Sequence, residues 1–462
     1  MRSLALLAVF AILVGQAMAE PPVDSIETFR PVARTGSWSE SWRGADGKVE
    51  VREVRGEIWN DAIQAALAKE GTVHIPARPE PYYLDAPIIL QSGQSLIADA
   101  TTEIRLKPGT NTCMVRNEHV VGFNDRPVPP GIAPDRDIRV EGGIWTTLAN
   151  GVPGANGNLR GASAKQNSVP GTHGVILLHN VQRVTVKNVT VRQSKPFAVH
   201  LGNAQDFVVD GVRLDRHERD GVHVDGPSSN GVIRQVSGDS HDDPVALTAW
   251  DWVNYVVTYG PVHHITIEHI TGVPESQHGT DAIRLLPGVK RFADGTTLNC
   301  EIHDITLRDI ADIREFKFYD QPNLEKGRDQ DASDGLGKLR NIVLQRLTFT
   351  RPGVIQIAAE VDGLRVEDVD LNFPLPPAFK LIEIGPMSAT YRSGSDPKHW
   401  VELFSPDRDV TVRGFQFGKV SVNGQPVADA NTRFVSIKGQ QLNPDYPHTT
   451  PRGGIGKATV LP

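Results

Sequence analysis

Residues 197–247 decide the fold, and their sequence is FAVHLGNAQDFVVDGVRLDRHERDGVHVDGPSSNGVIRQVSGDSHDDPVAL. Within this stretch the triplet Val199-His200-Leu201 recurs as Val222-His223-Val224 and then as Val245-Ala246-Leu247, each time 23 residues further along the chain. In each copy two apolar residues flank a middle one, as expected of a strand whose successive side chains point to opposite faces. Short strands that recur at a fixed period, with turn residues between them and without long helical segments, indicate a solenoid.

The same strand pattern continues at longer spacings. Later copies begin at Ile283, Phe316 and Ile355, which lie 38, 33 and 39 residues after the copy before. A unit of 23 residues has the size of one coil of a right-handed parallel β-helix with three short strands per coil, and the longer spacings indicate loops inserted into a turn. A β-propeller needs about 40 residues per blade, which argues against that fold. We therefore predict an all-β protein, with one parallel β-helix domain over residues 20–440 and its core coils in 172–420.

Three segments flank or interrupt the predicted coils. Residues 57–69 carry apolar side chains at helical spacing and are followed by Gly71, so they are predicted to form a helix. A helix there would cap the open N-terminal end of the solenoid. Residues 117–171 are rich in Gly, Pro and Asn and contain one good strand, at Ile138-Arg139-Val140. The rest of this segment is predicted to be long loops beside the stack. Residues 441–462 are predicted to be a polar peripheral tail.

The N-terminus has the pattern of a cleavable signal peptide. Arg2 gives a positive start, an apolar run extends from Leu4 to Val14, and Ala17-Met18-Ala19 is a small-x-small cleavage site. We expect residues 1–19 to be removed, which leaves a secreted or periplasmic protein that begins at about Glu20. The apolar run is short for a transmembrane span, so no membrane insertion is expected.

Composition narrows the function further. The chain has 462 residues, of which 39% are hydrophobic, so a large core can be buried. The formal net charge is −7, with 48 basic against 55 acidic residues, and this lack of a basic excess argues against nucleic acid as a partner. The two cysteines, Cys113 and Cys300, exclude a disulfide scaffold and a four-cysteine zinc site; they either pair or remain buried thiols. We expect a monomer.

Acidic residues recur in register with the strands. The position two residues before the strand is Asp220, Asp243 and Asp281 in three successive coils, and Asp242 adds a fourth acid. Neighbouring strands lie about 4.8 Å apart, so these residues are expected to form one patch. Strict alternation would aim them at the core, so the patch requires a bend before each strand. One proton-donating and one water-activating carboxyl are what glycoside hydrolysis needs, and we predict Asp220, Asp242 and Asp243 as catalytic.

Cations and aromatic residues near the acids suggest how a sugar is held. The middle column of the strands carries His223, Arg284 and Lys317, and cations suit an acidic sugar such as a uronate. Aromatic side chains in the following loop are candidates for stacking on sugar rings. The predicted substrate-binding residues are His223, His278, Asp281, Arg284, Lys317, Trp250 and Trp252. The predicted partner is a polysaccharide or oligosaccharide, with no cofactor.

The run from Arg219 to Leu247 resembles glycoside hydrolase family 28, the polygalacturonase-like enzymes of the pectin lyase-like β-helix proteins. That family has an Asn-Thr-Asp-Gly segment and, about one coil later, a Gly-Asp-Asp segment. Asp220-Gly221 matches the first segment and Asp242-Asp243 the second. The resemblance implies a right-handed parallel β-helix that hydrolyses a pectin-like polysaccharide with inversion, and it implies that these three aspartates are the catalytic acids.

The sequence also departs from the family pattern. Arg219 replaces the threonine of the first segment, His241 replaces the glycine of the second, and His223 stands where the family commonly has a further aspartate. The family's Arg-Ile-Lys segment is absent as such, and Arg284 and Lys317 are candidates for its charges by their column alone.

Two other functions stay open beside the hydrolase. A polysaccharide lyase shares this solenoid; its acids would bind Ca²⁺, and Lys317 or Arg284 would abstract the proton next to a uronate carboxyl. A non-catalytic carbohydrate-binding protein would use the acids as a ladder of turn residues. An ultraviolet-absorbing unsaturated product would identify the lyase, and binding without turnover would identify the binding protein.

Overall fold

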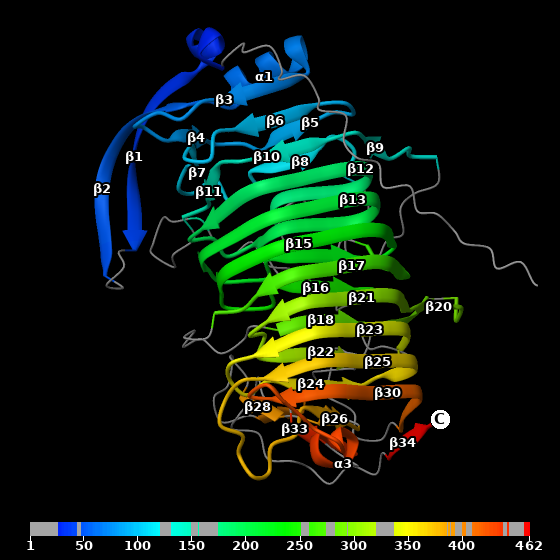
Figure 1. Ribbon diagram of the computed structural model, residues 1–462. Helices are drawn as coiled ribbons and strands as arrows, with labels where there is room; N and C mark the ends of the chain where they lie inside the picture. The colour runs from blue at the N-terminus through cyan, green and yellow to red at the C-terminus, as the bar shows by residue number, and fades with distance from the viewer. Residues whose placement is uncertain are drawn as a thin grey trace, which may run out of the picture.

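The computed structural model describes residues 26–43, 48–120, 131–148, 156, 174–250, 258–273, 282–292, 294–319, 337–385, 387–388, 390–392, 400–402, 409–437, 441–442 and 457–462. In these residues the chain winds into a stack of parallel coils, from blue at the N-terminal end to red at the C-terminal end (Figure 1). Parallel strands joined by crossovers within one sheet wind right-handed. The predicted right-handed parallel β-helix is thus confirmed. Among the helices of the described residues, none is both long enough and apolar enough to cross a bilayer.

The predicted strand register is the observed one. Val199 pairs with Val222, Val222 with Val245, and Val245 with Ile283. The register then passes to Phe316 and from there to Ile355. The strands of this face are β13 (Phe197–His217), β14 (Val222–Asp225), β16 (Val245–Thr248), β18 (Ala282–Leu286), β22 (Glu315–Tyr319), β24 (Val354–Ala358) and β26 (Ile382–Ile384).

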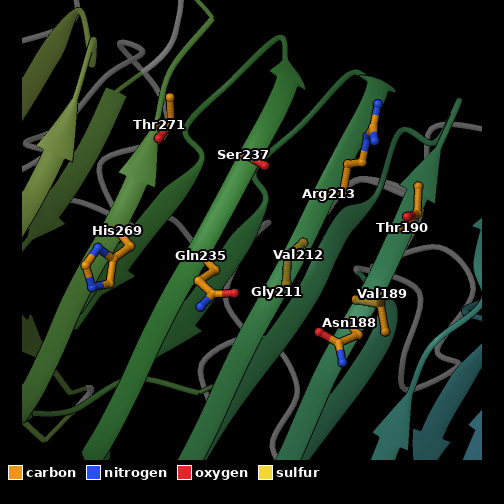
Figure 2. Close-up of a pocket in the computed structure, with 10 residues that line it drawn as sticks. All are labelled: Asn188, Val189, Thr190, Gly211, Val212, Arg213, Gln235, Ser237, His269 and Thr271. Carbon is orange, nitrogen blue, oxygen red and sulfur yellow. The ribbon is translucent and has the colours of Figure 1, made fainter. Parts of the chain in front are cut away.

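Longer strands wrap the other faces. They are β12 (Gly174–Arg192), β15 (Ser228–Ser240), β17 (Val262–Thr271), β21 (Ile302–Ala311), β23 (Lys338–Phe349), β25 (Glu360–Leu371) and β30 (Val410–Val422). One corner is formed by stacked residues with positive φ, namely Asn188, Gly211, Gln235 and His269. An open groove with polar side chains follows this corner across β12, β13, β15 and β17 (Figure 2), and no candidate catalytic residue lines it.

The hydrophobic core runs along the inside of the stack. Val222 and Val224 of β14, and Val245 and Leu247 of β16, have no exposed surface and belong to it. The middle residues of these strands lie outside the core cluster. Both cysteines are buried and free, so the unpaired alternative is the correct one. Burial raises the pKa of the Cys113 thiol to about 12.

A helix caps the N-terminal end, as predicted, but it begins later. It is α1 (Asn60–Glu70), because Glu57 and Ile58 belong to β2 (Val49–Ile58), which pairs antiparallel with β1 (Arg34–Arg43). Ala62, Ile63, Ala66 and Leu67 of α1 are buried against the first coil. Gly71 ends the helix with a φ of 69°, a conformation that favours glycine. The turn η1 (Ile26–Val32) packs beside it.

Two segments predicted to lie beside the stack are part of it. In the predicted loops at 117–171, β10 (Arg139–Glu141) and β11 (Ile144–Thr146) pair with β12 and with earlier coils, because Val140 and Trp145 supply inward-facing residues. In the predicted tail, β34 (Ala458–Leu461) pairs in parallel with β30. The strand predicted at Ile138-Arg139-Val140 is confirmed as β10, whereas the prediction of loops was wrong for β11 and that of a peripheral tail was wrong for β34.

The remaining elements are short. They are β3 (Thr72–Ile75), β4 (Tyr82–Leu84), β5 (Ile88–Leu90), β6 (Ser95–Ala98), β7 (Glu103–Leu106), β8 (Val115–Asn117), β9 (Asp135–Arg136), β19 (Gly288–Arg291), β20 (Thr297–Cys300), β27 (Met387–Ser388), β28 (Thr390–Arg392), β29 (Trp400–Glu402), β31 (Gln425–Pro426), α3 (Ala430–Phe434), β32 (Val435–Ile437) and β33 (Gln441–Leu442).

Candidate active site

Two stacked turns carry the three candidate catalytic aspartates. Asp220 precedes β14, and Asp242 and Asp243 precede β16, so none of them lies within a strand. The N–H of Gly221 donates to the carbonyl of Asp243 at 2.9 Å. The two turns are therefore as close together as hydrogen-bonded neighbouring strands. A Cβ on Gly221 would lie 2.5 Å from the carbonyl oxygen of Pro244, so only glycine fits. These turns are the bend that the acidic patch requires.

The turns bring the three carboxylates together. One oxygen from each of Asp220, Asp242 and Asp243 lies within 4.8 Å of the others. Asp220 and Asp243 are buried, whereas the side chain of Asp242 is 17% exposed. Asp242 is therefore the member of the cluster that a substrate reaches most easily.

Cations surround the aspartates. Arg284 Nε lies 2.7 Å from one oxygen of Asp243, and Lys317 Nζ lies 3.3 Å from the other. Arg284 and Lys317 are register partners in adjacent coils, as their shared column predicted. Arg219 forms an ion pair with Asp242. Buried charges persist only when they are paired, so these contacts explain how the fold tolerates the cluster.

His223 fixes the charge of Asp220. Its Nδ1 lies 2.6 Å from Asp220 Oδ2. Burial by itself would raise the pKa of Asp220, but the hydrogen bond to His223 and the positive charge of that ring lower it to about 2. The ring of Phe197 stacks on the His223 ring, with centroids 4.0 Å apart. Asp220 is thus an ionised carboxylate over the whole ordinary pH range.

The neighbouring pair, Asp242 and Asp243, has raised pKa values. Burial raises the pKa of Asp243 to about 7, although Arg284 and Lys317 oppose the shift. Burial and the negative charge of Asp220 also raise the pKa of Asp242. Because the two carboxyls interact, the retained proton belongs to the pair rather than to one residue. The cluster therefore contains one ionised carboxylate beside a pair that holds a proton.

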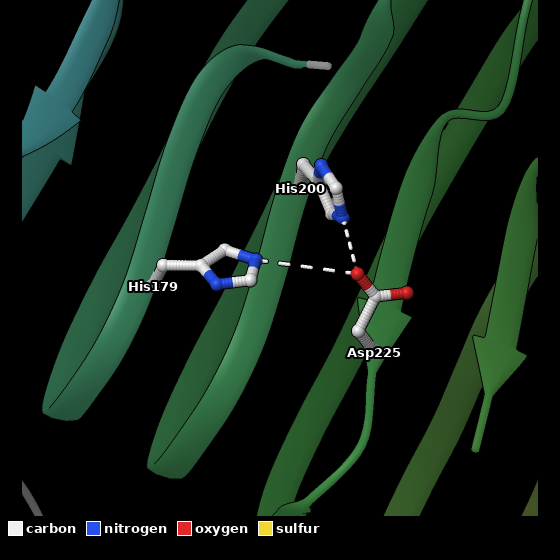
Figure 3. A group of neighbouring side chains, drawn as sticks. All are labelled: His179, His200 and Asp225. Atoms are coloured by element: carbon white, nitrogen blue, oxygen red, sulfur yellow. Dashed lines mark hydrogen bonds and ion pairs between the residues drawn. The ribbon is translucent and has the colours of Figure 1, made fainter. Parts of the chain in front are cut away.

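Three further residues of the site were missed by the sequence analysis. They are His179, His200 and Asp225, all without exposed surface. Figure 3 shows both histidines pointing toward the Asp225 carboxylate, with His200 Nε2 at 2.8 Å and His179 Nε2 at 4.0 Å from Oδ2. His179 reaches over Gly202, where a Cβ would lie 2.2 Å from its ring. The signal was present, because residues 179, 202 and 225 follow one another at the 23-residue period.

Trp250 and Trp252 were predicted to stack on sugar rings. Trp250 is 1% exposed and packs in the hydrophobic core over Gly288, so its prediction as a substrate-binding residue was wrong. Trp252, His278 and Asp281 lie outside the described residues.

Two groups of these side chains are close enough to hold a metal ion. They are the three aspartates, and the trio His179, His200 and Asp225. In the first group Arg219, Arg284 and Lys317 already contact carboxylate oxygens. In the second, ring nitrogens of His200 and His223 contact the Asp225 oxygens. Donors of the protein itself thus contact carboxylate oxygens in both groups.

The fold and site define a right-handed parallel β-helix protein with a buried carboxylate cluster on one column of turns. No protein-family model and no curated protein matches the chain. Its structure is similar to an exopolygalacturonase from Thermotoga maritima, at 10% identity over 87% of each chain with a TM-score of 0.46.

Two further solved structures show a similar likeness. A family 28 exopolygalacturonase from Yersinia enterocolitica is 12% identical, with 92% of this chain and 83% of that chain covered and a TM-score of 0.44. The tailspike protein of Escherichia coli bacteriophage HK620, in complex with a pentasaccharide, is 12% identical, with 87% and 74% covered and a TM-score of 0.43. At 10–12% identity, these likenesses assign no chemistry to any residue of the chain.

Proposed function

We propose that the protein is an exported glycoside hydrolase that cleaves a pectin-like acidic polysaccharide by acid–base catalysis with Asp220, Asp242 and Asp243. One observation carries this proposal: one oxygen from each of Asp220, Asp242 and Asp243 lies within 4.8 Å of the others. The lowered pKa of Asp220 and the raised pKa of Asp243 support a division into base and acid. Hydrolysis of a glycosidic bond needs one group that donates a proton to the leaving oxygen and one that activates water.

The environments of the acids suggest their roles. Asp242 is partly exposed and shares the proton of the pair, so it presents that proton to the glycosidic oxygen. Asp220 is ionised and accepts a proton from the attacking water, and Asp243, held by Arg284 and Lys317, orients that water. In the reaction the bond between the anomeric carbon and the glycosidic oxygen breaks, and a new bond forms between that carbon and the oxygen of water. Asp242 gives a proton to the leaving oxygen, and the attacking water gives a proton to Asp220.

The expected stereochemistry is inversion, as the resemblance to family 28 implies. One oxygen from each aspartate lies within 4.8 Å of the others, whereas the two carboxyl groups of an inverting enzyme lie roughly 6.5–9.5 Å apart, so inversion requires the side chains to turn apart and admit the water. A retaining mechanism would need Asp220 to attack the anomeric carbon as a nucleophile, whereas the proposed mechanism needs it to accept a proton from water. Proton NMR of the first-formed product distinguishes inversion from retention, and we expect the inverted anomer. Initial release of the retained anomer would contradict the roles assigned to the three aspartates.

The cations beside the acids support a uronate-containing substrate. The side chains of Arg219 and Arg284 are 18% and 17% exposed next to Asp242 and Asp243. A guanidinium offers several N–H groups, so each can contact a sugar carboxylate while it still donates a hydrogen bond to its aspartate. Since these cations supply the positive charge, we propose that the enzyme needs no cofactor.

The first experiment is a substrate panel. Polygalacturonate, methylated pectin, alginate and neutral polysaccharides are incubated with the protein, and reducing ends and ultraviolet absorbance are both followed. We expect reducing ends from a uronate polymer without unsaturated product. Absorbance from unsaturated ends would instead identify a lyase, and binding without any product would identify a carbohydrate-binding protein. N-terminal sequencing of exported material is expected to begin at Glu20, and its mass in solution to be that of a monomer.

A further inference from the structure

His223 has an acid at each ring nitrogen. Its Nδ1 lies 2.6 Å from Asp220 Oδ2, and its Nε2 lies 3.1 Å from Asp225 Oδ1. A neutral imidazole donates at one nitrogen and accepts at the other, whereas an ionised carboxylate only accepts. With two carboxylates as partners, both nitrogens must carry hydrogen. The geometry therefore fits a charged imidazolium between two ionised acids.

The surroundings of Asp225 favour its ionised form. Its second oxygen lies 2.8 Å from His200 Nε2, and both residues have no exposed surface. Each of its carboxylate oxygens thus faces a ring nitrogen that can donate. Phe197 covers one face of His223, with the two rings 2° from parallel, and an aromatic face attracts a cation.

We propose that Asp225 is a positioning residue, which acts through His223 to hold the ring charged and to orient Asp220 as the water-activating base. Its role in catalysis rests on the proposed function, whereas the charge of His223 does not. Burial would lower the pKa of His223, but the hydrogen bonds to Asp220 and Asp225 raise it to about 10, in agreement with the geometry.

Other titratable groups also face this chain of contacts. They are His200 of β13, His217 at the end of β13, Arg219, Asp242, Asp243, Arg284 of β18 and Lys317 of β22. Burial lowers the pKa of His217 to about 4, so this histidine is neutral and donates from Nε2 to the carbonyl of Asp220. Within the described residues, none of these groups hydrogen-bonds to the ring nitrogen of His223 that faces away from Asp220. Asp225 does, which makes it the residue to test.

The test is a histidine NMR titration of the full exported chain, with ring carbons labelled and the His223 signal assigned by its loss in His223→Gln. We expect the wild-type His223 ring to stay charged from about pH 5 to about pH 9, although an ordinary histidine titrates near 6.5. In Asp225→Asn its midpoint should fall by at least about one pH unit. His200→Gln keeps the Asp225 carboxylate and is the matched control, in which His223 stays charged.

Two outcomes would overturn the proposal. One is a wild-type His223 that titrates near about 6.5. The other is an Asp225→Asn protein that is folded, as near-ultraviolet circular dichroism shows, but whose His223 midpoint is unchanged. If Asp225→Asn does not fold, Asp220→Asn is titrated instead. A His223 ring that stays charged at neutral pH in this variant is held charged by Asp225 and supports the proposal. A ring that titrates like an ordinary histidine contradicts the proposal.

A kinetic measurement separates this proposal from the proposed function. On the substrate found with the panel, the kcat of Asp225→Asn relative to the wild type should fall as the pH rises through the lowered His223 midpoint, with little change in KM, because the ring then loses the charge that holds Asp220. A ratio of the two kcat values that does not change with pH would contradict positioning through His223. If no substrate is hydrolysed by the wild type, the hydrolase assignment fails while the titration still decides the state of His223.

Discussion

At the scale of single residues, three aspartates of the site differ in protonation because their surroundings differ. Asp220 is ionised because a charged histidine donates to it, while burial makes the Asp242–Asp243 pair retain a proton. The same carboxyl group can thus serve as base in one place and as acid a few ångströms away.

The Asn variants test this separation directly. Asp220→Asn, Asp242→Asn and Asp243→Asn each keep the shape of the side chain and remove the acid, so turnover should fall about 10²–10⁴-fold. Asp210→Asn is the control, because Asp210 pairs with Arg234 away from the cluster. Near-normal activity in all three variants would exclude the assigned roles.

The pH profile follows from the two shifted groups. Activity should fall as the pH rises through about 7, because the raised pKa of Asp243 is where the pair loses its proton. The unfolded chain releases this proton near about 4. The pair's contribution to stability therefore declines as the pH rises from about 4 to about 7. Activity that persists unchanged up to about pH 9 would show that the pair is not the donor.

At the scale of single elements, the close approach of two turns builds the cluster. Gly221 allows the turn before β14 to hydrogen-bond directly to the turn before β16. A side chain there would meet the carbonyl of Pro244, and backbone cannot move aside as a side-chain tip can.

Gly221→Ala should therefore damage both stability and activity. Overpacking of this kind costs about 1–3 kcal/mol, and separated turns would also pull Asp220 away from the pair. The measurements are urea unfolding and turnover on the identified substrate. Gly418→Ala is the matched control, since a Cβ at Gly418 of β30 meets nothing within 4 Å. Equal effects of the two substitutions would mean that the contact with Pro244 is unimportant.

At the scale of the whole molecule, the stack needs its end closed. α1 covers the first coil with a buried face that includes Ile63 and Leu67, and without it the apolar interior would meet water. The coils then extend one continuous core along the molecule, which holds the turns of the active site in register.

A substitution in the cap should weaken the molecule without touching the site. Leu67→Ala removes a buried leucine and should cost about 2–5 kcal/mol, seen as a lower Tm. Lys69→Ala on the exposed side of α1 is the control, with a cost within about 1 kcal/mol. At temperatures where Leu67→Ala is still folded, its kcat should equal that of the wild type. An unchanged Tm would mean that α1 is not needed to close the stack.

The sequence by itself determined the periodic features of the protein. The coil length, the register of Val199, Val222 and Val245, and the column that carries Asp220 and Asp243 all follow from one repeat, because each coil stacks on the one before it. The capping helix was also predictable from its local pattern, apart from its first residues, which β2 takes as a strand.

Tertiary structure alone decided what lies between the coils. Trp250 is aromatic and follows the acids, but only packing shows that it faces the core. The sequence predicts a polar tail at β34. The segment forms a strand there because the edge of β30 provides backbone groups with which it pairs. His223 becomes a charged link because the fold places Asp220 and Asp225 at its two nitrogens. Such contacts depend on which way each side chain turns at a bend, and a repeat in the sequence does not encode that direction.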